Sequence, residues 1–286
     1  MNDPSAFSAG PSAAPSAVPS APPATPSSTP SAVRRRALAV AGLGAVLVVL
    51  AMAVIGRLIN ASPAVEALDL SGVRSANSAL TPFTSALAVG IDLACGPAGA
   101  APIAALVVVG AWILTRRLRS GFGAGVLIAV PWASAELVKI MVRRQRPDPH
   151  VLVRALVPDP PSFSFPSGHT AFAAAICCAI ILLLRGRTAR TAGVLLGASA
   201  VLVTAWSRVA LGVHHPTDVV ASIVMAPILS LLTARALSVL GVMDVLGARG
   251  RSDARGEDDG GAPSAEASID QPTAQMSGQS RGARHA

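Results

Sequence analysis

Three short stretches of the chain contain the residue types that phosphoryl transfer requires. Together they supply three cations, two histidines, one carboxylate and a Ser-Gly pair. Cations stabilise the charge that spreads over the oxygens of a phosphoryl group in the transition state, and a histidine can act as nucleophile or proton donor. In chain order the stretches are Lys139-x6-Arg146-Pro147, Pro166-Ser167-Gly168-His169 and Ser207-Arg208-x5-His214-x3-Asp218. These residue types indicate a phosphoryl-transfer site.

The first stretch places two cations seven residues apart, which corresponds to two helical turns. A helix that extends past Val142 would therefore present Lys139 and Arg146 on one face, and Pro147 would end it. The arginine adds a bidentate fork that a lysine does not offer. A basic segment that contacts anionic lipid headgroups is an equally good interpretation of this stretch alone.

The second stretch is expected to open a helix. Backbone N–H groups at a helix N-terminus bind anions, and Gly168 permits close approach. Ser167 either donates to a phosphate oxygen or caps the helix. His169 is either a catalytic group or a histidine at the membrane interface.

The third stretch contains a histidine and a carboxylate four residues apart. If a helix starts near Pro216, Asp218 can accept from one ring nitrogen of His214 and leave the other as a nucleophile. Asp218 can equally be an acid at the positive end of a helix. On composition alone His215 is a rival nucleophile, and Ser207 is a loop hydroxyl.

The composition predicts an all-α, polytopic membrane protein. Hydrophobic residues make up 52% of the 286-residue chain and charged residues only 13%, and the apolar residues occur in long uncharged runs. The net charge of +8 is concentrated at the ends of these runs, which indicates membrane topology and no nucleic-acid partner. The three cysteines form no metal or disulfide pattern.

The apolar runs predict six membrane-spanning helices within a domain of residues 37–242. Residues 79–95 are expected to form an interfacial or re-entrant helix, because Pro82 and Asp92 interrupt them. Tails of residues 1–36 and 243–286 are expected to be disordered, since they have too few apolar residues to form a core. The predicted spans are 37–56, 98–115, 121–142, 168–184, 191–206 and 217–240.

Six crossings place all three stretches on the same side of the membrane. Most arginines outside the stretches fall on the other side, together with both tails, which predicts that this other side is cytoplasmic. The site then faces outward, in a multi-pass protein of the cell membrane. One outer loop is basic against this rule, and phosphate binding would explain it.

The ordered set of stretches resembles the complete tripartite signature of the type 2 phosphatidic acid phosphatase (PAP2) superfamily. The resemblance covers roughly residues 37–240, including the six-helix layout. It implies a phosphatase that uses no metal and no cofactor and forms a phosphohistidine intermediate. Among the two candidate histidines, the spacing from Arg208 selects His214. The implied roles are nucleophile for His214, its orientation for Asp218, leaving-group protonation for His169, and phosphate binding for Lys139, Arg146, Arg208, Ser167 and Gly168.

The expected substrate is a lipid phosphate or diphosphate monoester in the outer leaflet. Polyprenyl diphosphate is the first choice if the cell is bacterial, followed closely by phosphatidate and phosphatidylglycerol phosphate. Two alternatives remain, namely a lipid-linked phosphotransferase and a protein that binds or transports phosphate lipids. Glu136, one turn before Lys139, and Asp92 are interpreted as structural charges. The sequence leaves the oligomeric state open.

Overall fold

The computed structural model describes residues 30–243. The predicted tails lie outside these residues, with two exceptions: residues 30–36 belong to the first helix, and Met243 is buried in an apolar cluster. The described chain contains eight α-helices, one 3₁₀ turn (η1, Pro149–Val151) and no strand, as the predicted fold class requires. The α-helices are α1 (Pro30–Asn60), α2 (Pro63–Ser78), α3 (Pro82–Cys95), α4 (Pro97–Thr115), α5 (Leu118–Val142), α6 (Gly168–Leu183), α7 (Arg187–Ala210) and α8 (Pro216–Val239).

Proline and hydroxyl residues determine where several helices begin. α2, α3, α4 and α8 each start with a proline, whose fixed φ suits the first helical position and whose missing N–H is not needed there. Ser62 and Thr81 cap α2 and α3 by accepting from backbone N–H groups three residues on. The chain therefore turns sharply between neighbouring helices.

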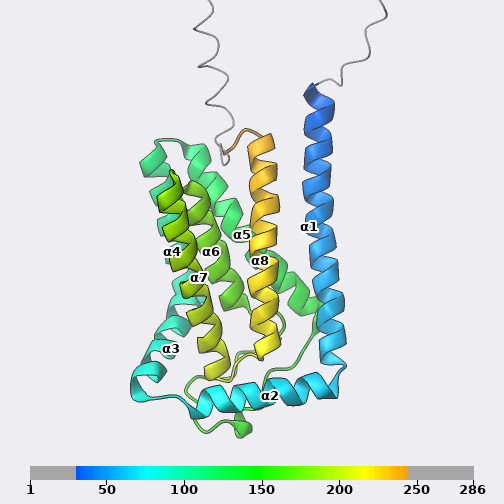
Figure 1. Cartoon of the computed structure of the whole chain (residues 1–286), viewed down its shortest axis with the longest axis vertical. Helices are drawn as coiled ribbons and strands as arrows, with labels where there is room; N and C mark the ends of the chain where they lie inside the picture. Colours follow the sequence, from blue (N-terminus) through cyan, green and yellow to red (C-terminus); the bar gives the residue numbers. More distant parts are fainter. Residues whose placement is uncertain (1–29, 244–286) are drawn as a thin grey trace, which may run out of the picture. The chain divides into compact units, whose positions relative to one another are not determined.

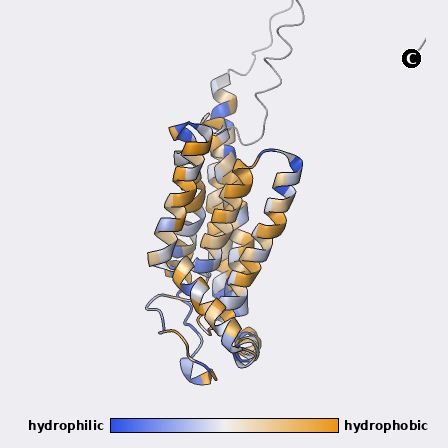
Figure 2. Cartoon of the chain, turned by 90° about the vertical axis from the view of Figure 1, so that its left-hand side faces the viewer, coloured by the Kyte–Doolittle hydropathy of each residue, from blue (hydrophilic) through white to orange (hydrophobic). Residues whose placement is uncertain are grey.

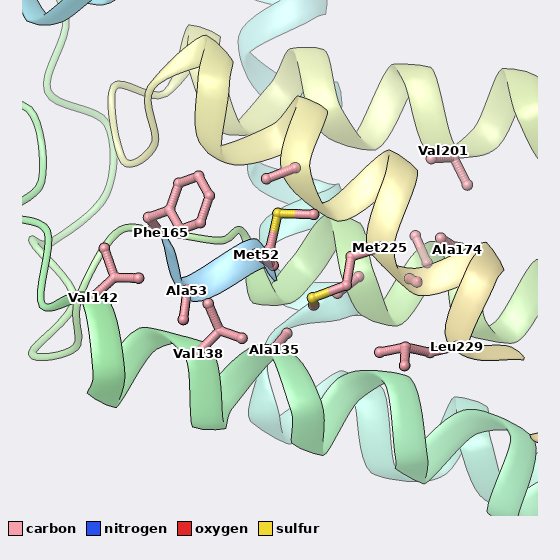
Figure 3. Close-up of a cluster of buried hydrophobic side chains, with 14 residues drawn as sticks. Met52, Ala53, Ala135, Val138, Val142, Phe165, Ala174, Val201, Met225 and Leu229 are labelled. Atoms are coloured by element: carbon pink, nitrogen blue, oxygen red, sulfur yellow. The ribbon is translucent and has the colours of Figure 1, made fainter. Parts of the chain in front are cut away.

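α6 is the central helix, because it packs against α3, α4, α5, α7 and α8. Its first half is rich in alanine and almost entirely buried. Small residues allow helices to approach closely in a membrane, where apolar burial alone gives no preference for helix contact. The main buried cluster surrounds it and includes Met52 of α1, Val138 of α5, Met225 of α8, and Phe165 from the loop before α6 (Figure 3).

Five helices in the described residues are long and apolar enough to cross a membrane, namely α1, α4, α5, α7 and α8. They correspond to five of the six predicted spans, and α6, which is apolar but has 16 residues, corresponds to the sixth. Hydrophobic residues cover much of the helical bundle, whereas hydrophilic residues gather toward its ends (Figure 2). Long apolar helices of this kind are typical of an integral membrane protein.

α2 and α3 form a pair bent by 118°, which is either a broken span or a re-entrant loop. α3 occupies the segment predicted to be interfacial or re-entrant, whereas α2 was not predicted from the sequence. α2 lies across one end of the bundle (Figure 1). At that same end α5 finishes, α6 begins, and α7 turns into α8 (Figure 1). The three stretches therefore meet at one end of the bundle.

Candidate active site

A cavity of about 590 Å³ opens at this end of the bundle, and residues from all three stretches line it. It is also lined by the α3–α4 elbow, by α5 and by the loop before α6. The sequence-predicted residues on its wall are Lys139, Arg146, Gly168, His169, Arg208 and His214. Ser167 and Asp218 are not among its lining residues, since both are fully buried behind the wall.

The two cations of the first stretch reach the cavity without the continuous helix considered from the sequence. α5 ends at Val142, and Arg143 adopts a left-handed conformation with φ of 56°. The predicted helix past Val142, with Pro147 as its stop, is therefore absent. Lys139 points into the cavity from the last turn of α5, and Arg146 enters from the loop. Both still line the same space.

Lys139 is paired and Arg146 is held by backbone oxygens. The Lys139 ammonium lies 2.8 Å from Oε1 of Glu136, so Glu136 provides its counter-charge. Arg146 donates to the backbone oxygens of Ser162 (2.8 Å) and Val213, and to the Ser162 hydroxyl (3.0 Å). These contacts fix the guanidinium at the cavity wall before any anion arrives.

Arg208 and His169 share one carboxylate, Asp92 of α3. Nη1 of Arg208 donates to Oδ1 of Asp92 (2.5 Å), and Nε2 of His169 lies 3.5 Å from the same oxygen. All three residues line the cavity. Asp92 thus faces the site, although the sequence analysis favoured a purely structural role for it.

Ser167 caps α6, as one of its two predicted roles requires. Its Oγ accepts from the Thr170 backbone N–H (3.5 Å) and from the Thr170 hydroxyl (3.0 Å). Gly168, the first residue of the helix, lies directly against the Lys139–Glu136 pair. A Cβ at Gly168 would be 2.8 Å from both the Lys139 ammonium and Oε1 of Glu136. Glycine is therefore required for the lysine to sit at the helix N-terminus.

His214 lies between Arg146 and Asp218. Nη1 of Arg146 is 3.2 Å from Nε2 of His214, and because a guanidinium can only donate, Nε2 is the unprotonated nitrogen. Nδ1 then carries the proton and faces Oδ2 of Asp218 at 3.5 Å. Burial lowers the pKa of His214 to about 3, although the Asp218 carboxylate acts in the opposite direction. His214 is thus a neutral imidazole whose unprotonated Nε2 accepts from Arg146 at the cavity wall.

The structure separates the two candidate nucleophiles. His215 is fully buried and does not line the cavity. Its Nε2 lies 3.1 Å from Glu66 of α2, and its Nδ1 lies 3.4 Å from Oδ2 of Asp218. Ser207 is also buried, and its hydroxyl donates to the Thr204 backbone oxygen, so it is part of α7 rather than a loop hydroxyl.

A buried network that the sequence did not predict lies behind Asp218. Arg144 is 1% exposed and contacts Asp218, Glu66 and Asp69. Ser164 also donates to Oδ2 of Asp218. The available signal was that two acids in a polar segment before residue 79 are spaced to lie on one helix face. Within residues 30–243, no group of three His, Cys, Asp or Glu side chains could hold a metal ion.

Comparison with known proteins finds a family match for part of the chain. Residues 118–240 match the family model described as the PAP2 superfamily. This stretch is a PAP2 superfamily domain. It comprises α5 to α8 and so contains all three stretches, whereas α1 to α4 precede it.

Several curated PAP2 relatives are phosphatases of polyprenyl-linked substrates. The decaprenylphosphoryl-5-phosphoribose phosphatase of Mycobacterium tuberculosis is 39% identical over 120 residues, which cover 42% of this chain and 63% of the relative. Undecaprenyl-diphosphatase BcrC of Bacillus subtilis is 32% identical over 133 residues, covering 46% and 66%. The chain therefore spans less than two thirds of the length of these relatives.

A solved structure shares the fold of this chain. The crystal structure of a transmembrane PAP2-type phosphatidylglycerolphosphate phosphatase from Bacillus subtilis aligns with a TM-score of 0.57 and 22% sequence identity. The alignment covers 66% of this chain and 94% of that one. The similarity supports the helical membrane architecture described above.

Proposed function

We propose that this PAP2 protein is an integral-membrane phosphatase that hydrolyses the phosphate or diphosphate monoester of a lipid. The observation that carries the proposal is the position of His214. It lines a cavity together with three cations, and its unprotonated Nε2 is on the side of Arg146. A protein that only binds phosphate has no use for a buried, neutral histidine backed by a carboxylate.

In the proposed first step, Nε2 of His214 attacks phosphorus. The N–P bond forms as the P–O bond to the leaving group breaks, and His169 gives its proton to the leaving oxygen. Asp218 stabilises the positive charge that develops on the imidazole. Lys139, Arg146 and Arg208 balance the charge on the phosphoryl oxygens, and the Gly168 amide at the start of α6 assists.

In the second step, water attacks the phosphohistidine. His169 now accepts a proton from the water, the P–N bond breaks, and phosphate leaves with the water oxygen as its fourth oxygen. The cycle balances without a metal or a cofactor, because side chains supply the positive charge. Activity is therefore expected to persist in EDTA.

The proposed substrate is a polyprenyl-linked phosphate. The curated relatives act on decaprenyl and undecaprenyl compounds by name. Apolar residues of the α3–α4 elbow, including Leu93, Ala98 and Ala100, line the cavity beside Trp132 of α5. They give a lipid chain an apolar surface next to the phosphate position. Phosphatidate and phosphatidylglycerol phosphate are the next candidates.

The deciding experiment measures phosphate release in detergent micelles from a polyprenyl diphosphate, a polyprenyl-linked sugar phosphate, phosphatidate and glucose 6-phosphate. We expect release from at least one polyprenyl compound with the highest kcat/KM, and none with His214→Ala. No release from any lipid phosphate, or strict dependence on Mg²⁺, would refute the proposed function. A preference for phosphatidate would overturn only the polyprenyl assignment.

We also propose that the site faces outward and that both tails face the cytoplasm. The arginines near the start of α1, between α4 and α5, and between α6 and α7 support this orientation. Single cysteines at Pro161 and at Gly260, in a variant without the native cysteines, can be treated with an impermeant thiol reagent on intact cells. Labelling at position 260 but not at position 161 would reverse the orientation.

A further inference from the structure

Arg144 occupies the centre of a buried ionic network that no part of the three stretches predicts. Its side chain is 1% exposed. Nη1 donates to Oδ1 of Asp218 (2.9 Å) and to the Thr217 hydroxyl (2.7 Å). Nη2 donates to Oε2 of Glu66 and to Oδ2 of Asp69, both at 2.8 Å. One guanidinium thus joins the carboxylate behind His214 to two carboxylates of α2.

α2 is fastened to the bundle at more than one point. Asp69 also accepts from the Thr217 backbone N–H (3.1 Å), at the start of α8. Near the other end of α2, the side chain of Asn77 bonds to both backbone groups of Arg154 and to the Ala210 backbone oxygen. α2 therefore ties together the loop after α5, the end of α7 and the start of α8.

The two oxygens of Asp218 have different partners. Oδ1 faces Arg144, whereas Oδ2 faces His214 and accepts from the His215 backbone N–H (2.8 Å). A carboxylate can rotate about its last torsion with little restriction, because terminal sp³–sp² torsions are broad. Contacts to both oxygens are what hold Oδ2 toward Nδ1 of His214.

We propose that Arg144 is a positioning residue of the phosphoryl-transfer reaction, and that Glu66 and Asp69 of α2 hold it in place. Arg144 orients Asp218, and Asp218 orients His214. The helix across the end of the bundle is thereby part of the catalytic apparatus, although it precedes the PAP2 domain match at residue 118. This inference rests on the proposed function.

An arginine is needed here because its fork serves two directions at once. Nη1 points to Asp218 and Nη2 to the α2 carboxylates, and a lysine has a single nitrogen for both. Arg143, the neighbouring residue, provides a matched control. It is exposed, does not line the cavity and makes a bond to the backbone of its own helix.

The test compares Arg144→Gln, Arg144→Lys and Arg143→Gln with the wild type, in the full chain in detergent. We expect Arg144→Gln to lower kcat by about 10²-fold, because misplacing a catalytic group by about 1 Å has this effect. KM and the inhibition constant for orthovanadate should change by less than about threefold, since the phosphate-binding cations are untouched. Arg144→Lys should recover part of kcat, and Arg143→Gln should match the wild type.

A double-mutant cycle separates positioning from a merely structural role. In an Asp218→Asn background, Arg144→Gln should lower kcat by less than about threefold more, because its effect passes through Asp218. Additive effects, or a kcat for Arg144→Gln within about threefold of the wild type, would overturn the inference. A wild type without lipid phosphatase activity would instead refute the proposed function.

If Arg144→Gln does not fold, Glu66→Gln replaces it in the test. The Glu66 side chain is 44% exposed, so we expect its neutralisation to keep the fold intact while it weakens one contact of Arg144 by removing the charge. We expect kcat to fall about tenfold at constant vanadate inhibition, since the phosphate-binding cations are unchanged. An unchanged kcat would overturn the role of α2.

Discussion

Replacing Gly168 by alanine should separate activity from stability. The added Cβ would lie 2.8 Å from the Lys139 ammonium and from Oε1 of Glu136, closer than real Cβ atoms approach. Both atoms end flexible side chains, so they can move until the distance reaches ordinary contact at about 3.4 Å. The lysine then leaves the position at which, on the proposed function, it would meet the phosphoryl oxygens.

The two free-energy effects of this substitution differ in size. Moving two side-chain ends costs little, and alanine is favoured over glycine in a helix by up to about 1 kcal/mol. Folding stability should therefore change by less than about 1 kcal/mol. Loss of one preorganised donor from a transition-state site costs about 3–4 kcal/mol, and a displacement of the donor by less than about 1 Å costs less. We expect kcat to fall by about 10²-fold.

The assay measures kcat, KM and the thermal unfolding temperature of Gly168→Ala in the same detergent as the wild type. Gly110→Ala in α4 is the matched control, because a Cβ there meets nothing within 4 Å. The control should keep wild-type kcat. A kcat for Gly168→Ala within about threefold of the wild type would mean that Lys139 does not act at the N-terminus of α6.

Three further predictions concern the histidines and Asp92. His214→Ala should abolish phosphate release, whereas His215→Ala should retain a measurable part of it; the reverse order would show that the nucleophile is wrongly assigned. Asp92→Asn should lower kcat and tighten vanadate binding about tenfold, because a carboxylate about 4 Å from a bound anion repels it by about 1 kcal/mol or more; weaker vanadate binding would contradict this reasoning. Because burial lowers the pKa of His214 to about 3 from 6.5, the unfolded chain binds more protons between these values, so stability should fall as pH drops through this window. Unfolding temperatures of His214→Ala should depend less on pH there, and equal slopes for the two proteins would exclude this cause.

The sequence predicted most of the membrane-spanning helices closely, for a simple physical reason. Long uncharged runs must be helical in a membrane, where every backbone polar group needs a partner within its own segment. The predicted 98–115 and 168–184 agree with α4 and α6 to within one residue. The prediction for α7 was too short at both ends, because its terminal turns contain arginines that lie outside the apolar run.

α2 could not be recognised from an apolar pattern. Its buried residues include Asp69 and Asn77. Both are polar, and both face the bundle because they form ionic contacts or hydrogen bonds with other parts of the chain. Those partners come from residues that are 75 or more positions away, so no local pattern reveals them. The helix does not continue past Val142 for a related reason. Arg144 leaves the helical path and contacts Asp218, which is distant in the sequence.

The spacing of the site residues identified which side chains gather, but not how they are paired. The three stretches led to the residues on the cavity wall, since their order matched a family signature. The orientation of Asp92 toward Arg208 depends on the bend between α2 and α3, which composition does not encode. The choice of His214 over His215 could be made by resemblance alone, and the structure adds a physical reason, since His215 is turned toward Glu66.

The shortness of α6 has a consequence for where the reaction takes place in the bilayer. Sixteen residues at 1.5 Å each give about 24 Å, less than the roughly 30 Å of hydrocarbon that α5 and α7 can cross. The N-terminal end of α6 is the buried one, while Arg185 beyond its other end is exposed. If the exposed end of α6 lies at one membrane boundary, its N-terminal end lies about 6 Å short of the other. On the proposed function we therefore expect a preference for membrane-anchored phosphates over soluble ones, because a lipid phosphate can reach this depth while its chain stays in hydrocarbon.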